Sequence, residues 1–392
     1  MPKDSPRDWP AVRVTAVLDA GSPLRWLQGL SFHWPQPVLR SLSEGSGPEW
    51  GSAVAAGREL RLHRPEGTLP WTNADRTAAL DAIAYTSRPL SSRLPFSYQK
   101  VPPFLRTVAA ASLLKLNRLR LSSQSPFPSW PLDLSLDSLS DISAWCEGSM
   151  GTPPFANTAA LTHDIDNPEA LRYLPHFLAL EERMGIRSTI FVVPNAWDLD
   201  HGVLRRAFEA GHEIGVHGFN HDNKTPFLQE VRIRERLESC GAFVERYGIR
   251  GYRSPSLLRS PLLSRLLAEY FSYDSSVPTA AAAYSSHGNG CATARPFPFH
   301  GLLQVPLTLP PDATLRFSGF SPSGALALWT SLSDVIRASG GMASLLTHCE
   351  PRHSGASGWF SGYAEFLGRL RAIPGRRFKT LGQVVSDYAS AR

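Results

Sequence analysis

Carboxylates and histidines gather just behind short apolar runs in the second half of the chain. Asp164 and Asp166 follow one such run, and His217 and His221 follow another. Two histidines and one carboxylate are a common ligand set for a catalytic zinc ion, which keeps a fourth position open for water. Residues two apart on a strand share a face, so one carboxylate could bind the metal while the other acts as a base. The spacing favours a hydrolytic metal site, although chance also produces such histidine pairs in a chain with 12 histidines.

Other polar residues follow later apolar runs in the same half. They are Arg253 and Ser256, then Asp274, and finally His348. In a parallel α/β barrel the C-terminal ends of the strands meet at one face, and active sites lie there. We therefore expect these side chains to surround one pocket together with the histidine pair.

Taken in chain order, these motifs resemble those of the polysaccharide deacetylases of carbohydrate esterase family four, also called the chitooligosaccharide deacetylase homology domain. The resemblance covers about residues 158–392. It implies a distorted, partly open (β/α) barrel and metal-dependent hydrolysis of an N- or O-acetyl group from a sugar. The expected cofactor is one divalent metal ion, with Zn²⁺ as its identity.

The resemblance also implies a role for each matching residue in the metal-binding motifs. Asp164 would be the catalytic base. The metal would be held by Asp166, His217 and His221. These roles agree with the chemistry that the residue types and their spacing favour.

The remaining motifs would supply the rest of the catalytic set. Arg253 would contact the base, and the backbone N–H of Ser256 would help to hold the oxyanion. Asp274 would orient His348, and His348 would protonate the leaving group. His353 lies beyond the last strand in a Gly- and Ser-rich loop and is a weaker candidate for the acid.

The chain departs from the family pattern around the sugar-binding surface. His163 stands where phenylalanine is usual, and it is expected to pack in the core because it faces away from Asp164. Ser256 replaces a common aromatic residue, and Ser275 follows Asp274 where the family has a tryptophan. These changes leave the substrate open. Besides a carbohydrate or glycoconjugate deacetylase, the chain could be a deformylase or amidase of a small metabolite, or a catalytically silent carbohydrate-binding scaffold.

The apolar pattern predicts the elements that would carry these residues. After residue 157, short apolar runs typical of buried strands alternate with helical stretches, which predicts a parallel α/β architecture. The expected strands are 159–162, 188–193, 213–216, 271–274, 302–309 and 342–347. A helix is expected over 226–247 with Thr225 as its N-cap, and Pro175 is expected to begin or kink the helix within 169–184.

Residues 1–155 differ in composition and apolar pattern from the rest, and they are predicted to form a smaller mixed N-terminal domain of unassigned role. Within them, 71–86 and 103–121 show convincing helical patterns. The Ser- and Pro-rich stretch 122–157 indicates a linker, since such residues favour turns. The barrel domain would then occupy residues 156–392.

Composition excludes several other classes of protein. With 42% hydrophobic and 19% charged residues, the chain of 392 residues is too apolar to be disordered. The net charge of +6 comes from dispersed basic residues, which argues against a nucleic-acid partner. The 4 cysteines lie far apart, so we expect neither a disulfide framework nor a cysteine zinc site.

Targeting segments are also not evident in the sequence. No stretch approaches the roughly 18 consecutive apolar residues of a membrane span, and no signal peptide is visible at the N-terminus. We therefore expect a cytoplasmic protein whose partner is an acetylated saccharide or glycoconjugate. The sequence leaves its oligomeric state open.

Overall fold

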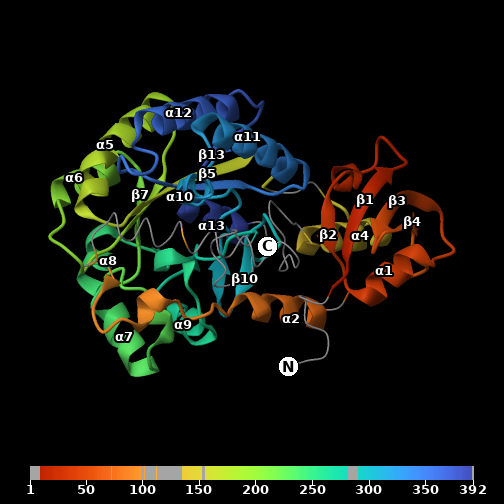
Figure 1. The fold of residues 1–392 in the computed structure, drawn as a ribbon, viewed down its shortest axis with the longest axis horizontal. Helices are drawn as coiled ribbons and strands as arrows, with labels where there is room; N and C mark the ends of the chain where they lie inside the picture. Colours follow the sequence, from red (N-terminus) through yellow and green to blue (C-terminus); the bar gives the residue numbers. More distant parts are fainter. Residues whose placement is uncertain are drawn as a thin grey trace.

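The computed structural model describes residues 9–71, 73–98, 101, 112, 135–151, 155–280 and 290–390. Within these residues the chain forms a small antiparallel sheet and a large, mostly parallel one (Figure 1). The small sheet comes from the first half of the chain and the large sheet from the second half. This confirms the predicted fold class, a distorted (β/α) barrel preceded by a smaller mixed unit. No helix among the described residues is long and apolar enough to cross a membrane.

The small sheet has the strand order β2-β1-β3-β4, and its core is continuous with the core of the large sheet. Buried and exposed residues alternate along β1, because successive side chains of a strand point to opposite faces. Phe32 stacks on Trp34 in this core, with ring centroids 5.8 Å apart. The elements of this unit are β1 (Ala11–Val17), η2 (Arg25–Leu27), β2 (Ser31–His33), α1 (Gln36–Ser43), β3 (Glu49–Ala55), β4 (Arg58–His63) and α4 (Ser135–Glu147).

The large sheet has the order β10-β11-β9-β8-β7-β6-β5-β12, with β13 also paired to β5. All its pairs are parallel except β10 with β11. Every residue of β5 is buried, as expected for a parallel strand covered by helices on one side and by the barrel interior on the other. Its strands are β5 (Thr158–Ile165), β6 (Thr189–Val192), β7 (Glu213–Val216), β8 (Gly251–Tyr252), β9 (Tyr273–Asp274), β10 (Phe297–Phe299), β11 (Leu302–Gln304), β12 (Ala343–His348) and β13 (Arg377–Phe378).

The sheet curls toward closure without a final pair of strands. The chain leaves β11 as an irregular segment, and there the backbone N–H of Leu309 donates to the carbonyl of Ser344 in β12 at 3.0 Å. The N–H of Ser344 donates to Oγ1 of Thr308 at 2.7 Å. The two ends of the sheet therefore meet through an irregular segment, which gives a partly open barrel.

Helices lie around the large sheet and at the ends of its strands (Figure 1). They are α5 (Pro168–Arg183), α6 (His201–Glu209), η5 (Thr225–Phe227), α7 (Glu230–Glu238), α8 (Gly241–Tyr247), η6 (Pro255–Leu257), α9 (Pro261–Leu267), α10 (Asp312–Phe317), α11 (Pro322–Ala338), α12 (Ser357–Arg371) and α13 (Leu381–Ser390). The helix expected over 103–121 lies outside the described residues.

Two helix predictions are wrong in detail. The single helix expected over 226–247 is divided into η5, α7 and α8. Between α7 and α8 the break falls at Gly241, because glycine disfavours a helix interior by about 1 kcal/mol and here begins a new helix. Thr225 therefore does not cap α7, whose N-cap residue is Gln229. Helix α5 begins at Pro168, capped by the Asn167 side chain, and continues through Pro175.

The first half of the chain contacts the barrel through a segment that we call the strap, residues 84–98. It follows α2 (Asn73–Ile83), which runs between the two units (Figure 1), and includes η3 (Leu90–Arg93). Oγ1 of Thr86 donates to the carbonyl of Arg259 at 2.7 Å and accepts from its N–H at 2.8 Å. Nδ2 of Asn223 donates to Oγ of Ser91 at 3.2 Å. The strap thus binds to loops that follow strands of the large sheet.

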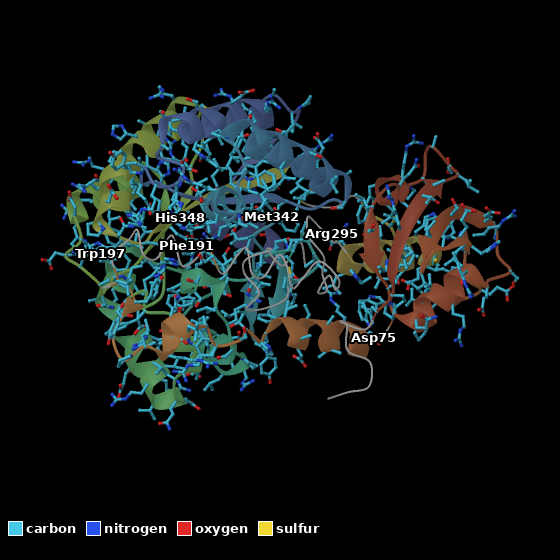
Figure 2. All side chains as sticks on the ribbon, viewed as in Figure 1. Asp75, Phe191, Trp197, Arg295, Met342 and His348 are labelled. Carbon is cyan, nitrogen blue, oxygen red and sulfur yellow. The ribbon has the colours of Figure 1, made fainter. Side chains whose placement is uncertain are left out.

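Helix α4 makes a second connection between the units. The guanidinium of Arg295 donates to both carboxylate oxygens of Asp141, each at 2.8 Å, and the N–H of Ala294 donates to Asp137 at 2.8 Å. Figure 2 shows Arg295 on the side of the barrel that faces the small sheet. On its other side, α4 accepts a hydrogen bond from Nε1 of Trp34 at Oγ of Ser138. The boundary near residue 155 remains a prediction.

A buried polar network lies on the face of β5 that points away from Asp164. Nε2 of His163 lies 2.8 Å from Oε1 of Glu181, and Oη of Tyr363 donates to the same oxygen at 2.6 Å. Nδ1 of His163 lies 2.9 Å from Oγ1 of Thr347. The prediction that His163 packs in the core is confirmed. Burial would raise the pKa of Glu181, but His163 lowers it below its ordinary value of 4.5.

We expect Glu181→Gln to destabilise the protein by about 3 kcal/mol at neutral pH, because it removes one partner of a buried pair. A carboxylate whose folded pKa is lowered stabilises the fold above pH 4.5, and this contribution is lost as the pH falls through the folded pKa. The deficit should therefore shrink on acidification. Thermal unfolding of wild type and variant across the acid range measures it, and a deficit that stays constant would contradict the assignment. Glu182→Gln, on the same helix with a 40% exposed side chain, is the control and should cost under about 1 kcal/mol.

Candidate metal centre

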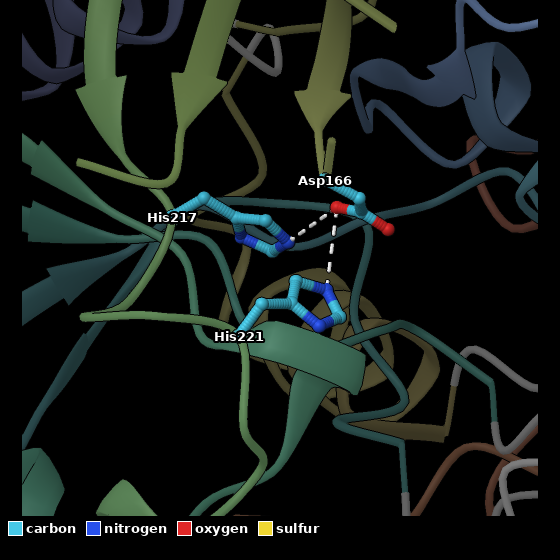
Figure 3. Close-up of side chains that lie close together, drawn as sticks. All are labelled: Asp166, His217 and His221. Atoms are coloured by element: carbon cyan, nitrogen blue, oxygen red, sulfur yellow. Dashed lines mark ion pairs between the residues drawn. The ribbon is translucent and has the colours of Figure 1, made fainter. Parts of the chain in front are cut away.

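Three side chains converge at the C-terminal ends of β5 and β7. Asp166 directly follows β5, His217 directly follows β7, and His221 lies in the loop after β7. The Nε2 atoms of His217 and His221 lie 3.1 and 3.3 Å from the same oxygen, Oδ1 of Asp166 (Figure 3). One ligand atom from each residue lies within 4.8 Å of the other two. We call these residues the Asp–His–His cluster.

The cluster fits a divalent cation. Oδ1 of Asp166 is buried and has no hydrogen-bond partner among the described residues, although it faces the two imidazoles. Burial would raise the pKa of Asp166, but His221 and His217 lower it well below its usual range, so the group is a carboxylate. Two imidazole nitrogens and one carboxylate oxygen are donors that suit zinc and similar ions.

The second nitrogen of each histidine is also engaged. Nδ1 of His217 donates to the backbone carbonyl of Arg253 at 3.1 Å, which leaves the Nε2 lone pair for the cluster. Nδ1 of His221 lies 2.8 Å from Oη of Tyr98, and the two rings are 6.0 Å apart. Partners of this kind fix the tautomer and the orientation of metal-binding histidines. Tyr98 belongs to the strap, a part of the chain to which the sequence motifs assign no role.

The loop after β7 places the two histidines on one side. Gly218 has a φ of +66°, and a Cβ there would lie 2.4 Å from Cδ of Pro255, so only glycine fits. His221 itself has a φ of +56°. Farther along, the guanidinium of Arg236 binds both carboxylate oxygens of Asp222 at 2.8 and 2.7 Å. This bidentate pair ties the loop to α7.

Asp164 lies beside the cluster and is held by a buried arginine. Nη1 of Arg253 donates to Oδ1 of Asp164 at 2.8 Å, while Oδ2 lies 3.5 Å from Nε2 of His217. The guanidinium also donates to Oγ and the carbonyl of Ser275 and lies 4.2 Å from the centroid of the Phe191 ring. Arg253 therefore occupies one oxygen of Asp164 and leaves the other facing the cluster.

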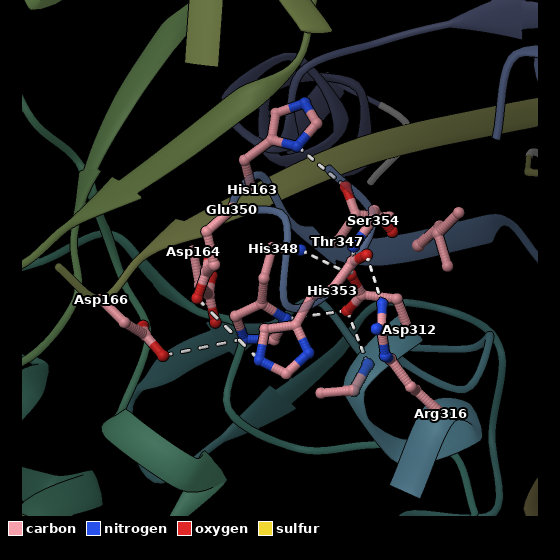
Figure 4. Close-up of polar contacts among 12 residues, drawn as sticks. His163, Asp164, Asp166, Asp312, Arg316, Thr347, His348, Glu350, His353 and Ser354 are labelled. Carbon is pink, nitrogen blue, oxygen red and sulfur yellow. Dashed lines mark hydrogen bonds and ion pairs between the residues drawn. The ribbon is translucent and has the colours of Figure 1, made fainter. Parts of the chain in front are cut away.

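His348 is the last residue of β12, the strand that pairs with β5, and it lies beside Asp166. Its Nε2 is 3.8 Å from Oδ2 of Asp166, and its Nδ1 is 2.8 Å from Oδ1 of Asp312 (Figure 4). Burial would lower the pKa of His348, but Asp312 raises it well above its ordinary value. The pKa of Asp312 falls to about 2, since His348 outweighs the effect of burial.

The partner of His348 in the structure is Asp312, whereas the motifs predict Asp274. Asp274 instead accepts a 2.5 Å hydrogen bond from Oγ of Ser276 at the end of β9, and burial raises its pKa to about 6. Asp312 takes the expected place because the start of α10 packs against β12. There its Oδ2 accepts the backbone N–H groups of His348 and Ser354 at 2.9 and 3.1 Å.

Two further titratable residues near the site, Glu350 and His353, have no assigned role in the sequence motifs. Oε1 of Glu350 accepts from Nδ2 of Asn167 at 3.2 Å, and burial raises the pKa of Glu350 to about 7. Burial and the neighbouring His348 lower the pKa of His353 to about 4. A neutral His353 has no proton to give as an imidazolium at neutral pH, so its place as an alternative acid weakens.

Ser256 lies at the edge of the site. It is exposed, has a φ of +52°, and its Oγ donates to Oδ1 of Asn223 at 3.2 Å. The role of its backbone N–H as an oxyanion donor stays a prediction.

We expect Asp312→Asn to lower the pKa of His348 by about 1–3 units, because it removes the adjacent negative charge. Asp274→Asn is the matched control and should leave this pKa within about half a unit. A histidine-labelled NMR titration of the metal-free protein measures both. An equal shift in the two variants would restore Asp274 to the role that the motifs predict.

Comparisons with known proteins place this geometry in context. Residues 152–275 match the polysaccharide deacetylase family. Among curated proteins, none matches the chain significantly. The site residues beyond 275, among them Asp312 and His348, lie outside the matched segment.

Several solved structures are similar to a large part of the chain. A structure named as a polysaccharide deacetylase from Mycobacterium smegmatis is 20% identical, with a TM-score of 0.47, and the match covers 62% of this chain and 93% of that chain. One so named from Pseudomonas aeruginosa PAO1 is 15% identical, with a TM-score of 0.49, covering 67% and 98%. Puue allantoinase is 17% identical, with a TM-score of 0.52, covering 62% and 96%, and it shares the fold. Residues 152–275, which contain the Asp–His–His cluster, thus match the model of the polysaccharide deacetylase family, the family that the motifs resemble.

Proposed function

We propose that the protein is a metal-dependent hydrolase that removes an N- or O-acetyl group from a carbohydrate or glycoconjugate. One observation carries this proposal: next to a ligand cluster for a divalent ion lie both a fixed carboxylate, Asp164, 3.5 Å from His217, and a histidine of raised pKa, His348, 3.8 Å from Asp166. Hydrolysis of an amide or ester needs a base on one side of the reacting carbonyl and an acid for the leaving group. The family match over residues 152–275 supports the acetylated sugar as substrate class.

Asp166, His217 and His221 would hold the ion, which we propose to be zinc. A divalent ion bound there supplies Lewis-acid polarisation of the acetyl carbonyl. The chain prepares this place in two ways. It supplies a buried carboxylate oxygen without a hydrogen-bond donor, and it directs the Nε2 atoms of both histidines toward that oxygen.

Asp164 is proposed as the general base. Its Oδ1 is occupied by Arg253, so Oδ2 faces the cluster and can take a proton from the attacking water. Arg253 is completely buried and makes further hydrogen bonds to Thr162 and Ser275, so the carboxylate is held in one orientation. The backbone N–H of Ser256 is the proposed donor to the oxyanion, a role worth about 3 kcal/mol in other hydrolases.

His348 is proposed as the general acid. Asp312 keeps its ring protonated and holds Nδ1, so the Nε2–H faces the cluster and can pass its proton to the leaving nitrogen or oxygen. Asp274, which does not contact His348, is not proposed to orient the acid.

A second candidate function is an amidase or deformylase of a small metabolite. The exposed Ser256 favours it, since this residue stands where an aromatic side chain would supply a surface for a sugar ring. The metal centre and the acid–base pair are the same in both candidates. They differ in the acyl group released and in the size of the substrate.

We expect purified wild-type protein to bind about one zinc or similar divalent ion per chain. The variant His217→Ala should bind far less. Loss of one of three ligands removes most of the affinity of such a site. Metal analysis after loading and dialysis measures this. His176→Ala, a change at an exposed histidine of α5, is the control and should keep the full metal content. Equal, low metal content in wild type and His217→Ala would overturn the metal site and the hydrolase with it.

We expect Asp164→Asn to keep its metal and to lose at least about 100-fold in turnover, since it removes the base while leaving the ligands in place. Acetate and formate release from a panel of acetylated saccharides, glycoconjugates and small amides measures turnover and separates the two candidates. Undiminished turnover in this variant would sink the acid–base assignment, and a metal-loaded wild type without turnover on any substrate would favour a carbohydrate-binding scaffold.

A further inference from the structure

A side chain from the first half of the chain contacts the Asp–His–His cluster. Tyr98 lies at the end of the strap, and its Oη is 2.8 Å from Nδ1 of His221. The two rings lie 6.0 Å apart at an angle of 51°. Tyr98 lies outside the segment that matches the deacetylase family, residues 152–275. The contact therefore adds a residue that the family motifs do not assign.

The strap is anchored close to this contact on both sides of the site. Oγ1 of Thr86 exchanges hydrogen bonds with the backbone of Arg259, and Arg259 also donates from Nε to the carbonyl of Ile83 at 3.0 Å. Arg259 is buried, so these bonds are shielded from water. Nearer to Tyr98, Ser91 accepts from Asn223, a residue of the same loop as His221. The position of Tyr98 is therefore fixed by the strap as a whole.

The contact has a defined consequence for His221. Its Nε2 lies 3.3 Å from Oδ1 of Asp166 and must offer a lone pair to bind a metal ion. A neutral imidazole with a free Nε2 carries its hydrogen on Nδ1, so Nδ1–H donates and Oη of Tyr98 accepts. Tyr98 thus does for His221 what the backbone carbonyl of Arg253 does for His217.

We propose that Tyr98 is a positioning residue of the metal centre. The strap holds Tyr98 against His221, so that His221 directs its Nε2 toward the ion. The inference rests on the proposed metal-dependent function. It assigns a role to the first half of the chain: the barrel supplies the metal ligands, and residues 84–98 complete the support of one of them. Substrate class plays no part in the argument.

Tyr98→Phe tests the proposal, because it removes the hydroxyl and keeps the ring. We expect zinc affinity to fall about 10- to 100-fold, the usual effect of losing the partner of a metal-binding histidine. Competition between the full-length protein and a zinc chelator measures this affinity. Tyr85→Phe is the matched control, since Tyr85 lies in the same strap with 63% of its surface exposed, and its affinity should equal that of wild type.

NMR of the zinc-loaded protein gives a second readout that a loss of general stability would not mimic. In wild type, the imidazole N–H of His221 should appear at Nδ1 and exchange slowly with water, because Oη of Tyr98 accepts it. In Tyr98→Phe this resonance should exchange at least about tenfold faster, while the Nδ1–H of His217, held by a backbone carbonyl, should be unchanged. The wild-type observation needs no variant, so it tests the contact even where Tyr98→Phe folds poorly.

The outcomes separate the two proposals. Suppose that wild type binds zinc, that the zinc affinity of Tyr98→Phe lies within about twofold of wild type, and that the His221 N–H is equally protected in both. This result would overturn the role of Tyr98 and leave the metal site intact. Wild type and His217→Ala that bind equally little zinc would overturn the metal site itself.

Discussion

The site depends on one buried carboxylate oxygen, Oδ1 of Asp166. Among the described residues no donor satisfies it by a hydrogen bond, and two imidazole nitrogens lie 3.1 and 3.3 Å away. Leaving a buried acceptor without a hydrogen bond costs about 1–3 kcal/mol. A protein tolerates such a cost where a ligand offsets it, and a cation between a carboxylate and two lone pairs is the ligand that these atoms suit. The carboxyl ends of β5 and β7 bring these three groups together.

Residues around the cluster fix the orientation of each histidine ligand. His217 is held by the backbone of the neighbouring strand end at Arg253, so its support comes with the sheet itself. His221 lies four residues farther along, in a loop with left-handed backbone at Gly218 and at His221. Backbone of this kind is strained for a histidine and persists only where the surroundings hold it. The Asp222 pair with Arg236 and the contact with Tyr98 supply that restraint.

The sequence predicts most of the barrel and the cluster, because both depend on local patterns. Apolar runs mark β5, β7 and β12 closely, and the polar residues behind them are the ones that converge. It misses contacts that depend on how distant segments pack. Asp312 is the first residue of α10 and belongs to no motif, and it meets His348 only because α10 packs against β12. Tyr98 is one of 10 tyrosines and carries no local signal that distinguishes it. The division of 226–247 follows from Gly241, whose helix-breaking effect the apolar spacing outweighed in the prediction.

The proposed acid and the proposed base each form an ion pair with a different residue of opposite charge. Asp164 is paired with Arg253 and His348 with Asp312, each at 2.8 Å; Asp164, Arg253 and Asp312 are buried, and the His348 side chain is 12% exposed. Arg253 orients the carboxylate of Asp164, while Asp312 holds the pKa of His348 above its ordinary value, as an acid that works beside a base requires. With neutral histidine ligands, the site holds two cations, Arg253 and the protonated His348. The carboxylates of Asp164, Asp166 and Asp312 exceed them by one negative charge. A divalent cation reverses that sign, so the loaded site would attract the developing oxyanion that the empty cluster would repel.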